Sequence, residues 1–449
     1  MQQIQKTGGW ALVPFFVFVL IFLGAGIALN DFYALPAPVA VVLGIISAFF
    51  ILRGSTEAKV TALIRGSGDS KIITMCLIYL LAGAFATVTK VVGGVDATVS
   101  LGLSVLPVQY LGLGVFLLAA FLSTATGTSV GAIVALGPIA VGLAEQSHTS
   151  LPLLLGTLLG GAMLGDNLSF ISDTTIAATQ SQECSMRDKF KVNILIAGPA
   201  ALVTIALLLF TGWSTAANAD ALVPELQIFS FWQIVPYLLV IGLAVSGGNV
   251  FAVLIIGTLA SGAVGLGQGQ LELLPFARSV YEGFTGMTEI FLLSMLTGGL
   301  AQMVSEAGGI AFLLQKVSKA TRGFRSAQTG IIALVGGTNT AIANNTVSIV
   351  VTGQVVKEIS NKYKIDKRKT AALLDIASCV VQGMLPYGAQ ILILLSFTKG
   401  DLSFLNIWAY NWYLYLLLLF SLLSIYTPFV DRYLARQTAA EQSLAAKAA

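Results

Sequence analysis

Two aspartates interrupt a stretch of this chain that is otherwise apolar enough to cross a membrane. Asp166 and Asp173 lie within the run Gly-Asp-Asn-Leu-Ser-Phe-Ile-Ser-Asp-Thr-Thr, residues 165–175. A carboxylate at membrane depth costs several kcal/mol unless it faces water, a partner or an ion, so an intramembrane acid predicts a functional site. The competing interpretation is a polar knot that only holds helices together.

The residues before the aspartates favour an interrupted helix. Gly160, Gly161 and Gly165 precede a stretch too polar to remain a helix in contact with lipid. Non-helical backbone at that depth is tolerated only where it lines a cavity or is buried in protein. The run therefore predicts a cation or proton site in a broken helix.

The composition identifies a membrane protein. Of 449 residues, 56% are apolar and only 10% are charged, whereas soluble domains are about 25% charged. Cys76, Cys184, Cys379 and the single His148 have no ligand-like spacing, so neither a disulfide framework nor a metal cofactor is expected. The fold class predicted is an all-α polytopic membrane protein that is not an enzyme.

Apolar runs of spanning length, about 20 residues, occur eight times. They cover residues 11–29, 36–52, 72–92, 192–212, 231–248, 249–268, 289–304 and 405–429.

Two longer stretches predict re-entrant hairpins, each followed by a broken span. Residues 109–145 contain a polar interruption at 123–129, and residues 328–358 contain interruptions at 336–340 and 344–345. The broken spans that follow are 151–181, interrupted at 165–175, and 370–398, interrupted at 383–388.

The basic residues set the predicted orientation, because cytoplasmic loops are enriched in Lys and Arg. With both termini in the cytoplasm, all of the 24 basic residues except Lys90, Arg278 and Lys399 lie on the cytoplasmic side. One cytoplasmic loop in this scheme is 186–191.

The scheme divides the chain into two inverted repeats of five spans, each with a hairpin and a broken helix. The first repeat is 1–212 and the second is 231–430, joined by an external connector at 213–230 and followed by a cytoplasmic tail at 431–449. Inverted repeats with paired discontinuous helices are typical of secondary transporters that bind their substrate at the membrane midplane.

The polar residues of the two halves predict different ligands. Sodium and protons require oxygen ligands. In the first half, the two acids Asp166 and Asp173 are candidate sodium ligands. The full predicted ion-binding set is Asp166, Asn167, Ser169, Ser172, Asp173, Thr174, Thr175, Thr126 and Thr128. The second half offers neutral groups and half-helix N-termini that suit a carboxylate: Asn339, Thr340, Asn344, Pro386, Gly388 and Gln390. For the asparagines and threonines, helix capping or helix packing is an equally open interpretation.

Two nearby acids also suggest how protons exchange for sodium. Buried like charges do not both ionise easily, so one acid is expected to hold a proton for which sodium competes. Asp166 is the preferred proton carrier and Asp173 the alternate. Asp375 either serves a cytoplasmic access path or is a solvated acid near a helix end.

The run at 165–175 resembles the NhaC-type sodium/proton antiporter family, whose members carry a similar Gly-Asp-x-x-Ser-x-x-Ser-Asp-Thr-Thr pattern. The matching residues are Asp166, Ser169, Ser172, Asp173, Thr174 and Thr175. The resemblance implies inverted repeats, a homodimer in the plasma membrane, and exchange of sodium for protons or small organic acids.

The second half departs from the family pattern. Typical members carry Pro-Trp-Asn-(Thr/Ser)-Cys-Gly, where this chain has Pro-Tyr-Gly-Ala-Gln at 386–390. The departure favours a branch that carries an organic solute such as an amino acid or carboxylate. Secondary antiport is therefore the leading hypothesis, and coupled transport of a small organic solute is the alternative. A channel, an intramembrane protease and an ATP-driven pump fit the pattern less well, the last because no nucleotide-binding loop is present.

Overall fold

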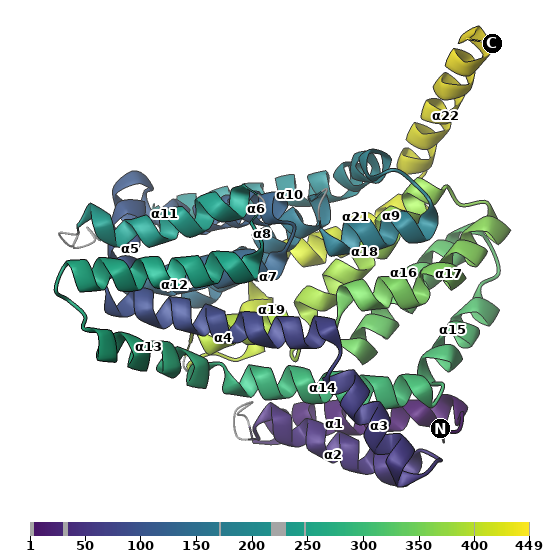
Figure 1. Cartoon of the computed structure of the whole chain (residues 1–449). Helices are drawn as coiled ribbons and strands as arrows, with labels where there is room; N and C mark the ends of the chain where they lie inside the picture. The colour runs from purple at the N-terminus through teal and green to yellow at the C-terminus, as the bar shows by residue number, and fades with distance from the viewer. Residues whose placement is uncertain are drawn as a thin grey trace.

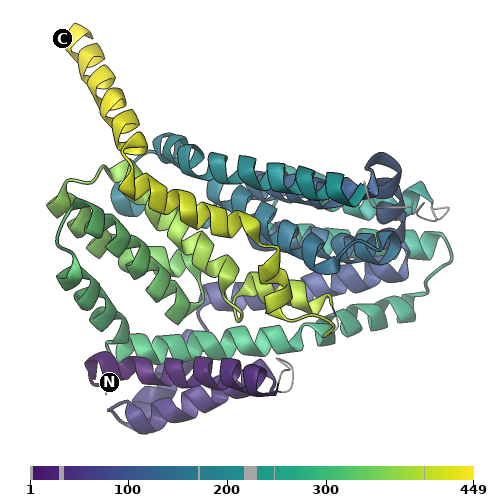
Figure 2. The same cartoon turned by 180° about the vertical axis from the view of Figure 1, so that it is seen from behind.

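The computed structural model is helical throughout the part of the chain that it describes, residues 4–29, 35–169, 172–216, 230–246, 248–398 and 400–448. The helices form an elongated bundle from which only the last helix projects (Figures 1 and 2). The connector predicted at 213–230 and Lys399 lie mostly or wholly outside the described residues.

The described residues of the first half form ten α-helices. They are α1 (Val13–Ala28), α2 (Ala37–Ile51), α3 (Thr56–Ser67), α4 (Ser70–Val91), α5 (Gly94–Val105), α6 (Leu111–Thr126), α7 (Ser129–Ser147), α8 (Leu151–Leu168), α9 (Asp173–Gln182) and α10 (Met186–Ala216).

In the second half, the residues that the structure describes form twelve α-helices. They are α11 (Phe231–Val245), α12 (Val250–Gly267), α13 (Leu273–Gly286), α14 (Thr288–Glu306), α15 (Gly309–Ala320), α16 (Phe324–Ile342), α17 (Asn345–Tyr363), α18 (Lys367–Met384), α19 (Ala389–Ser396), α20 (Phe404–Ala409), α21 (Trp412–Tyr426) and α22 (Phe429–Ala448).

The helices confirm a polytopic membrane protein. Within the described ranges, eight helical segments are long and apolar enough to cross a membrane, or up to ten if two bent pairs are each counted as one span. These bent pairs are α13 with α14, at 43°, and α21 with α22, at 62°. Every predicted apolar run coincides with at least one helix.

The interruptions that position the site are short. The pair α6 and α7 turns at Gly127, whose φ of +71° suits a residue without a side chain. The pair α16 and α17 turns at Ala343. Helix α8 ends at Leu168 before α9 begins at Asp173, and α18 ends at Met384 before α19 begins at Ala389.

One predicted interruption is wrong. Residues 336–340 were expected to break the helix, but they continue α16, and the only turn of this hairpin is at Ala343 and Asn344. The helix tolerates its polar residues because they find partners: the Thr340 hydroxyl donates to the Gly336 carbonyl one turn earlier, and the Asn339 amide donates to the Ser378 carbonyl at 2.9 Å.

Close crossings between helices of the two halves depend on glycine. Helix α4 crosses α13 where a Cβ on Gly83 would lie 2.2 Å from the Gly283 carbonyl oxygen, and one on Gly283 would lie 2.4 Å from the Gly83 oxygen. Helix α3 crosses α14 similarly, because a Cβ on Gly66 would lie 2.4 Å from the Gly298 oxygen. Small residues at helix interfaces allow such close backbone approach.

The C-terminal helix is attached to the start of α18. The buried Lys369 ammonium lies 2.9 Å from Asp431 of α22 and donates to the Ser424 carbonyl. Arg368 donates to the Thr438 hydroxyl. The predicted tail is thus a helix, which extends away from the bundle in Figure 1.

Candidate functional site

A cavity of about 270 Å³ lies where both hairpin tips and both interrupted helices meet. The α6–α7 tip contributes residues 127–131, and the α16–α17 tip contributes residues 343–346. The α8–α9 interruption contributes Asp166 and residues 172–174, while Gln382 and Gln390 come from α18 and α19. Segments more than 200 residues apart in the sequence therefore line one cavity.

Asp166 is the buried acid of this cavity. It lies in the last turn of α8 and is only 4% exposed. One carboxylate oxygen accepts a hydrogen bond of 2.8 Å from the Ser129 hydroxyl, and the other accepts one from the Ser172 hydroxyl. The hydrogen-bond partners that the structure gives it are therefore neutral groups.

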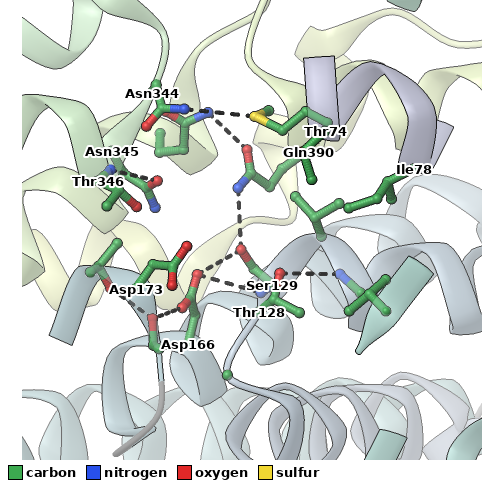
Figure 3. A pocket seen from close by; sticks show the side chains of 18 of the residues that line it. Thr74, Ile78, Thr128, Ser129, Asp166, Asp173, Asn344, Asn345, Thr346 and Gln390 are labelled. Carbon is green, nitrogen blue, oxygen red and sulfur yellow. Dashed lines mark hydrogen bonds between the residues drawn. The ribbon is translucent and has the colours of Figure 1, made fainter. Parts of the chain in front are cut away.

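A chain of hydrogen bonds connects Asp166 to the second half. The Gln390 amide donates to the Ser129 hydroxyl at 3.2 Å, and the Gln382 amide donates to the Gln390 carbonyl oxygen at 2.9 Å. Figure 3 shows Asp166, Ser129 and Gln390 joined in this way. The side-chain oxygen of the buried Gln382 has no partner in the described structure, so an acceptor remains free beside the cavity.

The two hairpin tips are capped in the same way. The Thr128 hydroxyl accepts from the Gly131 backbone N–H and caps α7. The Asn344 side-chain oxygen accepts from the Val347 N–H at 3.0 Å and caps α17. Capping satisfies N–H groups that a helix start leaves free. Because α7 and α17 both begin at the cavity, the positive ends of their helix dipoles lie beside it. The capping interpretation therefore holds for Asn344, which also lines the cavity.

The structure brings together part of the predicted ion-binding set. Thr128, Asp166, Ser172, Asp173 and Thr174 line the cavity. Asp173 is the first residue of α9 and is exposed, unlike Asp166.

Four predicted ion ligands face elsewhere. The Ser169 hydroxyl donates to the Thr124 carbonyl, and the Thr126 hydroxyl is within 3.5 Å of nearby backbone oxygens. Asn167 and Thr175 contact a lysine outside the cavity.

The predicted solute-binding set is similarly divided. Asn344 and Gln390 line the cavity, but Asn339, Thr340, Pro386 and Gly388 do not. The amide of Asn339 joins α16 to α18, and the Thr340 carbonyl accepts from the Tyr387 hydroxyl. These contacts support packing of the second half.

Sequence reasoning missed several residues of the cavity wall. Helix α4 contributes Ser70, Thr74, Met75 and Ile78, and α12 contributes Val250. Ser70, Thr74 and Ile78 are each one helical turn apart, but isolated hydroxyls in an apolar span give no recognisable signal. Gln382, a second glutamine eight residues before Gln390, was the more accessible signal.

The largest correction concerns Asp375 and Lys189. Asp375 is fully buried, so the interpretation as a solvated helix-end acid is wrong. It forms an ion pair with Lys189, which is 1% exposed and lies in the first turn of α10, where a loop was expected at 186–191. Asn167 and Asn193 also donate to the Asp375 carboxylate, at 2.8 and 3.1 Å.

Among the described residues, no group of three or more His, Cys, Asp or Glu side chains could hold a metal ion. The cavity lining combines neutral hydroxyl and amide groups with the buried carboxylate of Asp166.

Comparison with known proteins identifies the family. A model of the Na+/H+ antiporter family matches residues 3–213 and 215–430. The Na(+)/H(+) antiporter NhaC of Bacillus subtilis (strain 168) is 24% identical over 355 residues, which cover 72% of this chain and 77% of that protein.

Two further relatives are named for organic solutes. The Malate-2H(+)/Na(+)-lactate antiporter of Bacillus subtilis (strain 168) is 25% identical over 350 residues, covering 71% of this chain and 74% of that protein. The Arginine/ornithine antiporter ArcD of Halobacterium salinarum (strain ATCC 700922 / JCM 11081 / NRC-1) is 24% identical over 424 residues, covering 86% and 85%. The helical membrane fold and the family match over both halves lead to one conclusion: this chain belongs to the Na+/H+ antiporter family and is a membrane transporter.

Proposed function

We propose that this protein exchanges sodium for protons across the plasma membrane by alternating access, with Asp166 as the shared ligand. The observation that carries the proposal is the burial of the Asp166 carboxylate at the wall of the cavity, between serine hydroxyls. A carboxylate without a buried basic partner binds either a proton or a cation to lower its desolvation cost.

The neighbouring oxygens suit the proposed sodium ion. The hydroxyls of Ser172 and Thr174 and the carboxylate of Asp173 line the same cavity as Asp166. In Figure 3, Asp173 appears beside Asp166 at the junction of the hairpin tips. Asp173 is exposed, which favours a role in attracting the cation toward the buried acid.

We further propose that the two halves form an inverted repeat with both termini in the cytoplasm. In this repeat α3, α4, α7 and α9 correspond to α13, α14, α17 and α19. Helix α9 packs against α17, and their counterparts α19 and α7 also pack against each other. In the same way, α3 packs against α14, and α13 packs against α4. In Figure 1, α5 lies at one end of the bundle and α15 at the opposite end. Both features support an arrangement in which the halves have opposite orientations.

The test is transport by purified protein in liposomes. A sodium gradient is expected to drive proton movement in wild-type liposomes. Asp166→Asn keeps the size and some hydrogen bonds of the side chain but removes the charge. It is expected to lower exchange by more than about 100-fold, because loss of groups that only orient metal ligands already costs about 10–100-fold. Near wild-type exchange by a correctly folded variant would contradict the role of Asp166.

A second candidate function is coupled transport of a small organic solute. The cavity exceeds several-fold the ~30 Å³ that one water molecule occupies in the liquid, and Asn344, Asn345 and Gln390 give its second-half wall neutral polar groups. Two relatives are named for carboxylate or amino-acid exchange. The same liposomes, tested with malate, lactate, arginine and ornithine, distinguish the functions: full exchange that no solute changes would reject this candidate.

A further inference from the structure

A buried ion pair lies beside the interrupted helix but outside the cavity lining. Lys189 of α10 and Asp375 of α18 are 1% and 0% exposed. A buried pair is favourable only where further hydrogen bonds satisfy both charged groups. The contacts of this pair therefore indicate what holds it in place.

The Lys189 ammonium bridges the two sides of the interruption. It donates to the carbonyl of Asn167, near the end of α8, at 3.0 Å. It also donates to the hydroxyl of Thr175, in the first turn of α9, at 2.8 Å. With Asp375 as its third partner, the ammonium is satisfied by one group from each of three helices.

The contact with Asn167 has a clear physical basis. The last carbonyls of a helix lack partners within the helix and carry its negative dipole end. The ammonium and the Asn193 amide, which donates at 2.8 Å, both satisfy the Asn167 carbonyl. Asp375 balances the charge that this cap introduces into the protein interior.

We propose that Lys189 is a positioning residue for the cation site. Asp166 immediately precedes Asn167, and the cavity residues Asp173 and Thr174 immediately precede Thr175. By joining Asn167 to Thr175, Lys189 fixes the separation between the end of α8 and the start of α9. It thereby sets the distance between the two groups of cavity ligands without contacting the cation.

The competing explanation is purely structural: the pair only joins α10 to α18. Both explanations lead to lower thermal stability when the pair is removed. Only the positioning role leads to weaker sodium binding in protein that is still folded. The inference rests on the proposed function, because it assumes a sodium ion at Asp166.

The test removes both charges together, so that neither is left buried and alone. Lys189→Gln with Asp375→Asn keeps polar groups, but the glutamine side chain is too short to make both lysine contacts. We expect the sodium concentration for half-maximal exchange to rise about 10–100-fold, as when groups that orient metal ligands are removed. The sodium-dependent rise in melting temperature should move to higher sodium by the same factor.

A second variant covers the case in which the double variant does not fold. Thr175→Val removes only the acceptor on α9 and leaves the ion pair intact. It is expected to raise the half-maximal sodium concentration by several-fold. An unchanged value in Thr175→Val would overturn the proposed bridge.

The chain offers a matched control in the pair Lys369 and Asp431. Lys369 is also buried, but its ammonium bonds to Asp431 of α22 and to the Ser424 carbonyl of α21. Lys369→Gln with Asp431→Asn should lower the melting temperature and leave the half-maximal sodium concentration unchanged. Equal shifts in both double variants would indicate general loosening and reject the positioning role.

Measurements of sodium-driven exchange and sodium stabilisation on the wild type distinguish failure of this inference from failure of the proposed function. If sodium neither drives exchange nor stabilises the wild type, the sodium site itself is rejected, and the role of Lys189 with it. If sodium acts on the wild type and the Lys189 double variant responds at the same concentration, only the positioning role is rejected.

Discussion

The Asp166 carboxylate is held by serine residues that come from different elements. Ser129 begins α7, and Ser172 precedes α9. Hydrogen bonds to a charged group contribute about 1.5–3 kcal/mol each, so these hydroxyls orient the carboxylate before any ion arrives. Ser129 has a second role, because it accepts from Gln390 of the other half.

Replacement of Ser129 tests this double role. Ser129→Ala removes a donor to Asp166 and the acceptor of Gln390 together. The sodium concentration for half-maximal exchange in liposomes is expected to rise about 10-fold, the lower end of the effect of removing a group that orients a metal ligand.

Ser123→Ala is the matched control for this change. Ser123 is also a buried serine close to the same hairpin tip, but its hydroxyl donates to the Ala162 carbonyl. Its loss should cost about 0.5–1.5 kcal/mol of stability without changing the sodium response. A Ser129→Ala response equal to that of Ser123→Ala would contradict the proposed contact.

At the scale of elements, the glycines before Asp166 have a different function from the one expected. They do not end α8, which continues to Leu168. A Cβ on Gly161 would lie 2.2 Å from the Phe116 oxygen, and one on Gly165 would lie 2.3 Å from the Ala120 oxygen. The glycines therefore allow α6 to pack directly on α8, which brings the hairpin tip to Asp166.

This packing predicts opposite effects at two helical glycines. Gly165→Ala would force α6 away from α8, and such overpacking costs about 1–3 kcal/mol. Gly337→Ala in α16 meets no atom within 4 Å, and it should gain up to about 1 kcal/mol of helix propensity.

Melting temperatures of the purified proteins in detergent compare the two variants. Gly165→Ala should melt below the wild type and Gly337→Ala at or above it. A Gly165→Ala protein as stable as the wild type would show that the α6–α8 contact is not tight.

The sequence predicts the interruptions that have local causes. Gly127 with Thr128, and Pro386 with Gly388, mark turns through their own backbone preferences, and each lies at an observed helix end. The continuation of α16 through 336–340 has no local signal, because Asn339 depends on the Ser378 carbonyl from another helix.

The residues of the site were likewise predictable only where their signal is local. Asp166 is recognisable alone, since an acid within an apolar span requires explanation wherever its partners lie. The ion pair of Lys189 and Asp375 was not, because its members are 186 residues apart and each resembles a basic or acidic residue at a helix end.

At the scale of the whole molecule, the cavity lies between hairpins from the two halves. If these hairpins enter from opposite sides, their outer ends face different compartments. Ser150 follows α7 and Asn361 lies near the end of α17, and both are exposed. Ser147, the last residue of α7, is buried and hydrogen-bonded. Ser150 is therefore a better position than Ser147 for a cysteine that a reagent must reach.

Cysteine labelling tests the predicted orientation. Cys184 is partly exposed and should first be replaced by serine, while Cys76 and Cys379 are buried. In that background, Ser150→Cys should react with an impermeant reagent added outside intact cells, and Asn361→Cys only after the membrane is opened. Reaction of both from one side would exclude the inverted repeat.

The ion pair between the halves also has a consequence for biosynthesis. Lys189 is made before Asp375, and 186 residues of chain separate them. A ribosome that has completed only α10 has therefore produced a helix whose lysine, in the first turn, has no counter-charge, and a lysine near a helix end extends toward the membrane interface instead of staying buried. We expect Lys189 to become buried only when α18 arrives, and protease digestion of chains truncated before and after α18 would detect this late tightening.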